Sequence, residues 1–83
     1  MNAITLWNQN PAAIQGIEIS TETKWAIIRR HRVELLTQSD WTQLPDAVLT
    51  VAEKSAWQDY RQSLRDIPQD FINADDVIFQ ETP

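Results

Sequence analysis

The chain has no cysteine, one glycine and one histidine among its 83 residues. Without cysteine it forms no disulfide, and with His31 as its sole histidine it has no Cys/His cluster for a structural metal. A single glycine excludes the glycine-rich loops that cradle nucleotide phosphates. A chain this short buries a smaller fraction of its surface than a large one does, so we expect one domain of modest stability.

The sequence also lacks a long apolar run. No stretch approaches the roughly 20 apolar residues that a membrane-spanning helix needs. The N-terminal sequence MNAITLW lacks the basic start and the apolar core of a signal peptide. We therefore expect a protein that is cytoplasmic when made and has no membrane partner.

Negative charge is concentrated in the second half of the chain. Residues 1–38 carry four basic and three acidic side chains, whereas residues 39–83 carry three basic and nine acidic ones. Nucleic-acid binding relies on neutralising phosphates, so this balance predicts no nucleic-acid partner. The basic run from Arg29 to Arg32 is short, and we interpret it as a solvated helix face.

A helix is predicted over residues 21–38. Ser20 and Thr21 are both suitable N-caps for it. Ile27 and His31 lie away from the apolar stripe of this helix, so we expect both to be exposed. The stripe has helical spacing and includes one charged residue; its members are Trp25, Ile28, Arg32, Leu35 and Leu36.

The second predicted helix has the best-defined start in the chain. Thr50 and Glu53 have the spacing of a capping box, in which each side chain accepts a hydrogen bond from the backbone amide of the other residue. We expect this helix to end at about Asp66, before Pro68. The residues that share one of its faces are Glu53, Ala56, Trp57, Tyr60, Leu64 and Ile67.

Residues 1–20 are predicted to be extended. Ala3–Trp7 is rich in residues that favour strands, Ile17–Ser20 alternates apolar and polar residues, and a turn signal lies between them. An isolated hairpin is only marginally stable, so these segments are expected to lie on the helices or on a partner. In the C-terminal tail, residues 69–83, the segment Val77–Phe79 is either a short strand or an anchored extension.

The predicted fold is mainly α. We expect a single small domain, residues 1–83, built on a helical hairpin over residues 21–68 with short N-terminal β-strands and an extended C-terminal tail. Residues 39–49 connect the two helices. This connection is rich in large apolar residues, so we expect it to fold onto the helices.

No catalytic or metal-binding constellation is recognisable. His31 lies among arginines, without a nucleophile and an orienting group beside it. Asp75 and Asp76 are adjacent, which does not make them converge on one site, and we interpret them as part of a solvated turn. The sequence therefore predicts no enzyme activity, no cofactor and no bound metal.

Tryptophan, which occurs four times, is the strongest signal. We interpret Trp25 and Trp57 as core residues. Trp41 lies in the connection beside Leu44 and Pro45, and two interpretations stay open for it: a core residue, or part of a partner-binding face. Tryptophan, tyrosine and arginine are enriched in the hot spots of protein interfaces.

Two arginines, Arg32 and Arg61, lie on or beside the apolar stripes. A charge in such a position is costly unless it is paired or stacked. The spacing of Glu53, Trp57 and Arg61 would let Arg61 lie over the indole while it pairs with a carboxylate. Either the arginines clasp the two helices together, or they meet carboxylates and carbonyls of a partner.

Three motifs resemble the phage tail assembly chaperone family. They are an arginine-rich helix that ends in a Leu-Leu pair (Arg29–Leu36), the sequence SDWTQLPD (Ser39–Asp46), and the pattern W-x-x-Y-R-x-x-L-R-D-I-P (Trp57–Pro68). Together they cover about half of the chain. A weaker resemblance, centred on Trp57, Tyr60 and Arg61, extends to the wider set of tail-fibre assembly proteins, and Asp75–Val77 resembles the C-terminal end of the family.

The resemblance implies a non-enzymatic protein that helps a trimeric phage tail-fibre protein to fold or assemble, with several copies per fibre complex. It implies action in the host cytoplasm during assembly. Partly assembled fibre chains expose apolar surface and strand edges, which a small protein can cover. The residues expected to bind the partner are Trp41, Leu44, Pro45, Arg32, Tyr60 and Arg61.

Two alternatives stay open. The protein could be a structural tail component that is retained in the virion, for example at the fibre tip. It could also be a small acidic inhibitor of the host that mimics nucleic acid, although its acidic residues do not form a continuous stripe.

Overall fold

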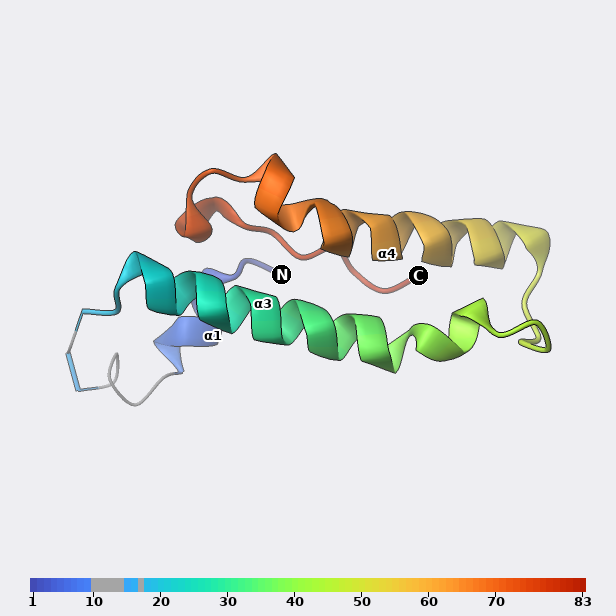
Figure 1. Ribbon diagram of the computed structural model, residues 1–83, viewed down its shortest axis with the longest axis horizontal. Helices are drawn as coiled ribbons and strands as arrows, with labels where there is room; N and C mark the ends of the chain where they lie inside the picture. The colour runs from blue at the N-terminus through green and yellow to red at the C-terminus, as the bar shows by residue number, and fades with distance from the viewer. Residues whose placement is uncertain (10–14, 17) are drawn as a thin grey trace.

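The fold is an antiparallel helical hairpin with both ends of the chain packed against it (Figure 1). The structure is a computed structural model, and it describes residues 1–9, 15, 16 and 18–83. The predicted mainly α fold is confirmed. The helices, in chain order, are α1 (Ile4–Asn8), α3 (Thr21–Gln38), the 3₁₀ turn η1 (Asp40–Gln43), α4 (Val51–Asp70) and the 3₁₀ turn η2 (Ala74–Asp76).

Helix α3 has the bounds that the sequence predicts. Its N-cap is Ser20, whose hydroxyl accepts a hydrogen bond from the backbone N–H of Thr23 at 3.2 Å. Glu22 lies in the first turn, where a negative charge interacts favourably with the helix dipole. The helix gives way at Ser39 to η1, so its C-terminus leads directly into the connection.

Helix α4 begins as predicted but ends later. The capping box is present: the Glu53 N–H donates to the Thr50 hydroxyl at 3.1 Å, and the Thr50 N–H donates to the Glu53 carboxylate at 3.0 Å. The predicted end near Asp66 is wrong, because the helix continues through Pro68 to Asp70. A proline so near a C-terminus removes only one late hydrogen bond, and the last turn bends away from the helix axis (Figure 1).

The first predicted strand, Ala3–Trp7, is not found. Residues 4–8 form helix α1 instead, and the backbone N–H of Ile4 donates to the side chain of Asn2 at 3.0 Å as the chain turns into it. The helical turn places Ala3 and Trp7 on one side, where both are buried. Strand propensity is a weak preference, and burial of these two side chains overrides it.

The remaining N-terminal predictions lie partly outside the described residues. The predicted turn includes residues 10 and 11, and the predicted second strand includes residue 17, none of which the structure describes. Residues 18–20 are described and form no regular secondary structure.

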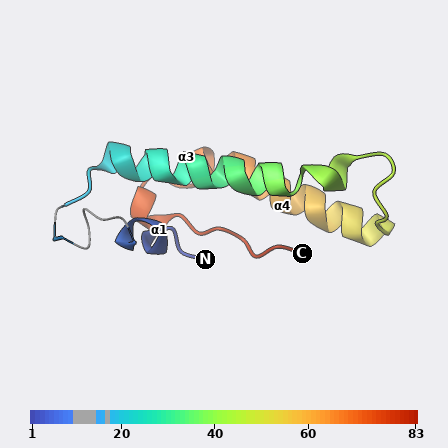
Figure 2. The ribbon, with the colours of Figure 1, turned by 90° about the horizontal axis from the view of Figure 1, so that it is seen from below.

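The core lies toward the open end of the hairpin, where the two terminal segments pack against α3 and α4 (Figures 1 and 2). An isolated antiparallel bridge joins Asn2 to Ile78, and the N–H of Ala3 donates to the carbonyl of Val77 at 2.9 Å. Only four of the buried core side chains come from the long helices. The buried hydrophobic residues are Ala3, Trp7, Ile28, Tyr60, Leu64, Ile67, Ala74, Val77 and Phe79.

This packing overturns two predicted exposures on α3. Ile27 is partly buried against the core, and His31 is partly buried with its ring meeting Phe79 edge-on at a centroid distance of 4.8 Å. A plain two-helix hairpin would leave these faces of α3 open. The terminal segments lie across the hairpin, so more of the circumference of α3 is buried than its apolar stripe predicts.

Candidate functional site

Four exposed apolar side chains lie at the closed end of the hairpin, where η1 and the chain after it lead into α4. Their exposed fractions are 48% for Trp41, 54% for Leu44, 96% for Val48 and 87% for Val51. These four residues, named here the tip surface, belong to η1, to the chain that follows it and to the first turn of α4. No terminal segment reaches this end of the hairpin (Figure 1).

Trp41 joins the tip surface to the inside of the hairpin. Its ring meets Trp57 edge-on at a centroid distance of 5.8 Å, and Trp57 meets Tyr60 edge-on at 5.6 Å. Such aromatic pairs contribute about 0.5–1.5 kcal/mol beyond the area that they bury. Trp41 is therefore held by Trp57 while about half of its surface stays open to a partner.

Arg61 of α4 fixes the start of the connection. One terminal nitrogen, Nη1, donates to the carbonyl of Leu36 and to the hydroxyl of Ser39, both at 2.7 Å. The other, Nη2, donates to the carboxylate of Asp40 at 2.9 Å. A cation at the C-terminus of α3 also interacts favourably with the helix dipole. We name these contacts of Arg61 the arginine clamp; they determine where the chain leaves α3 and thus where Trp41 emerges.

Ser39 and Thr42 complete the helix end, and neither is among the predicted site residues. The Ser39 hydroxyl donates to the carbonyl of Leu35 at 2.9 Å, and the Thr42 hydroxyl donates to the carbonyl of Ser39 at 2.7 Å. Both residues are buried. Their signal was the pair of hydroxyl residues three apart, directly after a predicted helix end, since such side chains often bond nearby carbonyls.

Five of the six predicted partner-binding residues fall into two groups. Trp41, Leu44 and Pro45 are exposed together on the connection, as a partner-binding face requires. Arg61 and Tyr60 are buried on α4; Arg61 pairs with Asp40 and clasps the two helices, which is one of the two alternatives for it. Its carboxylate partner is not Glu53.

Arg32, the sixth predicted residue, lies apart from the tip surface. It is one helical turn before Leu36 on α3 and is partly buried. In the part of the chain that the structure describes, its Nε and Nη1 atoms are buried without a hydrogen-bond partner. Val48 and Val51 were not predicted as partner-binding residues, because only the three-dimensional arrangement shows that no described segment covers them.

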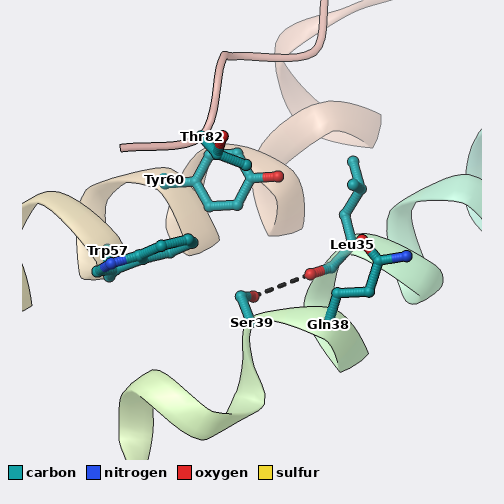
Figure 3. Close-up of a pocket in the computed structure, with 6 residues that line it drawn as sticks. All are labelled: Leu35, Gln38, Ser39, Trp57, Tyr60 and Thr82. Atoms are coloured by element: carbon teal, nitrogen blue, oxygen red, sulfur yellow. Dashed lines mark hydrogen bonds between the residues drawn. The ribbon is translucent and has the colours of Figure 1, made fainter. Parts of the chain in front are cut away.

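A pocket of about 150 Å³ opens beside the arginine clamp (Figure 3). Tyr60 lies on one side of it, and burial raises the pKa of the Tyr60 hydroxyl above its ordinary value. The residues that line the pocket are Leu35, Gln38, Ser39, Trp57, Tyr60 and Thr82.

Within residues 1–9, 15, 16 and 18–83, no group of three or more His, Cys, Asp or Glu side chains is arranged to hold a metal ion. In the same part of the chain, no helix is both long and apolar enough to cross a membrane.

A family model described as phage tail assembly chaperone protein matches residues 25–77. The match covers more than half of the chain, from the second turn of α3 to Val77, directly after η2. The chain belongs to the phage tail assembly chaperone family. Searches of curated proteins and of solved structures found no match.

Membership in the phage tail assembly chaperone family confirms the resemblance, since all three motifs fall inside the matched residues. It gives the protein a role in phage tail assembly, a phage tail protein as its partner in general, and a place of action in the host cell during assembly. It also suggests a non-enzymatic role. The matched region contains the tip surface and the arginine clamp but not α1.

Proposed function

We propose that this phage tail assembly chaperone is not an enzyme, that it binds a tail-fibre protein, and that it assists the folding and trimerisation of that fibre. The observation that carries the proposal is the tip surface, in which large apolar side chains are exposed on a connection that the arginine clamp fixes. An exposed apolar patch on a small protein typically marks a site of protein interaction.

The size of the tip surface fits a reversible complex. Burial of an aliphatic side chain contributes about 1.5–3 kcal/mol when the side chain was fully exposed before. The side chains of Val48 and Val51 are almost fully exposed, and those of Leu44 and the aromatic Trp41 are about half exposed. Association costs about 4–15 kcal/mol in lost freedom, so the tip surface alone supports weak binding, which suits a chaperone that releases its client.

A fibre chain before trimerisation suits this surface chemically. Its β-strands still expose apolar side chains and unpaired edges, which promote aggregation at the concentrations of a folding experiment. An acidic protein that covers such a patch keeps the chain soluble until the other two chains arrive. A trimeric client also offers several equivalent sites, hence several copies of the chaperone per fibre complex.

Co-expression with the fibre protein tests the proposal. We expect the fibre to be more soluble and more completely trimeric in the presence of the chaperone, and we expect a complex of the two to elute from a sizing column. A fibre that is equally soluble and trimeric without the chaperone, with no complex, would refute the proposal.

The matched pair Val48→Ser and Ile72→Ser shows which surface is used. Both side chains are more than nine-tenths exposed, but Ile72 lies beyond α4, at the other end of the hairpin. We expect Val48→Ser to weaken the fibre complex and Ile72→Ser to leave it unchanged.

Mass spectrometry of purified virions separates a chaperone that departs after assembly, which is absent from the virion, from a structural tail component, which is retained and present.

A further inference from the structure

The chain after η2 lies as an extended segment along the hairpin and contacts both long helices (Figures 1 and 2). Val77 and Phe79 are buried, whereas Ile78 between them is 51% exposed. Phe79 contacts His31 of α3. The groove between α3 and α4 thus accepts an extended chain whose alternate side chains are buried, which is the period of a β-strand.

This alternation stops after Phe79, although the groove continues. Residues 80–83 are all exposed. Two open pockets flank them: the pocket of Figure 3, on the α3 side, and a second of about 360 Å³ on the α4 side, lined in part by Ala56, Ser63 and Pro83. Tyr60 lines both pockets, and Thr82 lies beside its ring (Figure 3).

We propose that the groove around Tyr60 binds an extended segment of the partner, with aromatic or aliphatic residues at alternate positions and a basic flank, and that residues 80–83 move aside to admit it. The proposal rests on the proposed function, in which the unassembled fibre chain supplies this segment. Val77 and Phe79 already occupy the adjacent part of the same groove in this way, and the partner segment would continue their line toward the tip surface.

Size and charge both favour this occupant. An apolar cavity of about 150 Å³ accommodates benzene, so the first pocket has room for one aromatic ring. Asp59 of α4 lines the second pocket and stays in place when residues 80–83 move, and neither lysine nor arginine is among the described residues that line either pocket. Basic residues in the partner would therefore meet a complementary charge.

Residues 80–83 are free to move without disturbing the core. In the described part of the chain they make no hydrogen bond to any other residue, whereas the preceding segment is held by the backbone bond from the N–H of Phe79 to the carbonyl of Met1 at 2.7 Å. Displacement would thus open the two pockets into one groove while Val77 and Phe79 stay buried.

Fluorescence anisotropy with a labelled synthetic peptide tests the proposal directly. The probe is a short peptide in which Phe and Val alternate with Thr, with two lysines at one end; a second probe carries glutamates in place of the lysines. We expect the full-length protein to bind the lysine probe and to bind the glutamate probe at least about tenfold more weakly.

Three full-length variants report on the groove. Thr82→Trp supplies an indole to the first pocket from the chain itself, and we expect at least about a tenfold loss of peptide affinity. Gln80→Gly makes the displaced segment more flexible, and we expect a gain of about two- to fivefold. Gln58→Trp is the control, because Gln58 is exposed on α4 and lines neither pocket. All three positions are exposed, so melting temperatures should stay close to that of the unaltered protein.

Equal peptide affinity in Thr82→Trp and the unaltered protein would overturn the proposal, as would an equal loss in Gln58→Trp. A homodimer that Thr82→Trp abolishes, without peptide binding, would also overturn it, since the occupant would then be a second copy of the chain. The peptide assay contains no fibre protein. If the peptide binds in the groove but the protein has no effect on the fibre, the proposed function is refuted and the proposal of the groove stands. If the protein acts on the fibre but the peptide does not bind, only the proposal of the groove is refuted.

Discussion

The arginine clamp should be the most sensitive point of the hairpin to a single substitution. Arg61→Ala removes the donors to the Leu36 carbonyl, the Ser39 hydroxyl and the Asp40 carboxylate, and it leaves a gap in a buried position. The three contacts differ in value, because the acceptors differ in their other partners and in their exposure.

The Asp40 contact contributes least. The side chain of Asp40 is 64% exposed, so the ion pair is screened by solvent and contributes about 0–1 kcal/mol. The Leu36 carbonyl keeps hydrogen bonds from the N–H and the hydroxyl of Ser39. The largest losses are the partly buried charge-assisted bond to Leu36, the buried one to Ser39 and the packing of the arginine stem, which together we put at about 2–4 kcal/mol.

Urea unfolding followed by circular dichroism measures this cost. For a chain of this size a loss of about 2–4 kcal/mol lowers the melting temperature by about 10–30 °C. Arg65→Ala is the matched control. Arg65 is exposed one turn later on α4, and its side chain makes one long bond, of 3.4 Å to Gln62, among the described residues, so we expect a change within about 0.5 kcal/mol. Asp40→Asn should cost less than about 1 kcal/mol. If Arg61→Ala were as stable as Arg65→Ala, the clamp would not hold the hairpin end.

Three further predictions concern the aromatic residues and the capping box. Trp57→Ala should destabilise the fold by about 3 kcal/mol, whereas Trp41→Ala should cost about 1 kcal/mol and mainly weaken fibre binding; equal losses of stability in urea would contradict this division. Burial raises the pKa of Tyr60 above 10.0, so its contribution to stability is complete below pH 10.0 and is lost as pH rises through the native pKa. Tyr60→Phe should therefore weaken the fall of the unfolding free energy at alkaline pH, and an unchanged alkaline pH dependence would refute the assignment. The hydrogen bonds with Thr50 lower the pKa of Glu53 below 4.5, so the contribution of Glu53 to stability is present above pH 4.5 and is lost as pH falls through the native pKa. Glu53→Gln should therefore reduce the dependence of the unfolding free energy on pH in the acid range, and an unaltered dependence would count against the capping box in solution.

Local signals explain which parts of the fold were predictable. Ser20 and the pair Thr50 and Glu53 cap the helices through contacts within four residues, and such contacts are encoded in the adjacent sequence. The end of α4 was mispredicted because a proline in the last turn removes little that the helix needs.

The terminal segments were not predictable because distant contacts decide their structure. Residues 4–8 are helical where their composition favours a strand, since Trp7 is buried against the hairpin. The exposure of Ile27 and His31 depends on α1 and on the tail, which pairs with residues 1–3 from the opposite end of the sequence.

The candidate site was predictable in part. The sequence singled out Trp41, Leu44 and Arg61, and it left open whether Arg61 acts within the chain or on a partner. Only the arrangement of the two helices shows that Arg61 reaches Ser39 and Asp40. The exposure of Val48 depends equally on the absence of any described segment over the hairpin tip.

The affinity of the protein for the tail-fibre protein, compared between Val48→Ser and Ile72→Ser, tests the central claim most directly. Neither side chain contributes to the core, so both variants should unfold at the temperature of the unaltered protein. We expect Val48→Ser to lower the affinity about tenfold and Ile72→Ser to leave it unchanged, since burial of one exposed valine contributes about 1.5 kcal/mol or more. Equal affinities for the two variants would show that the tip surface does not bind the fibre.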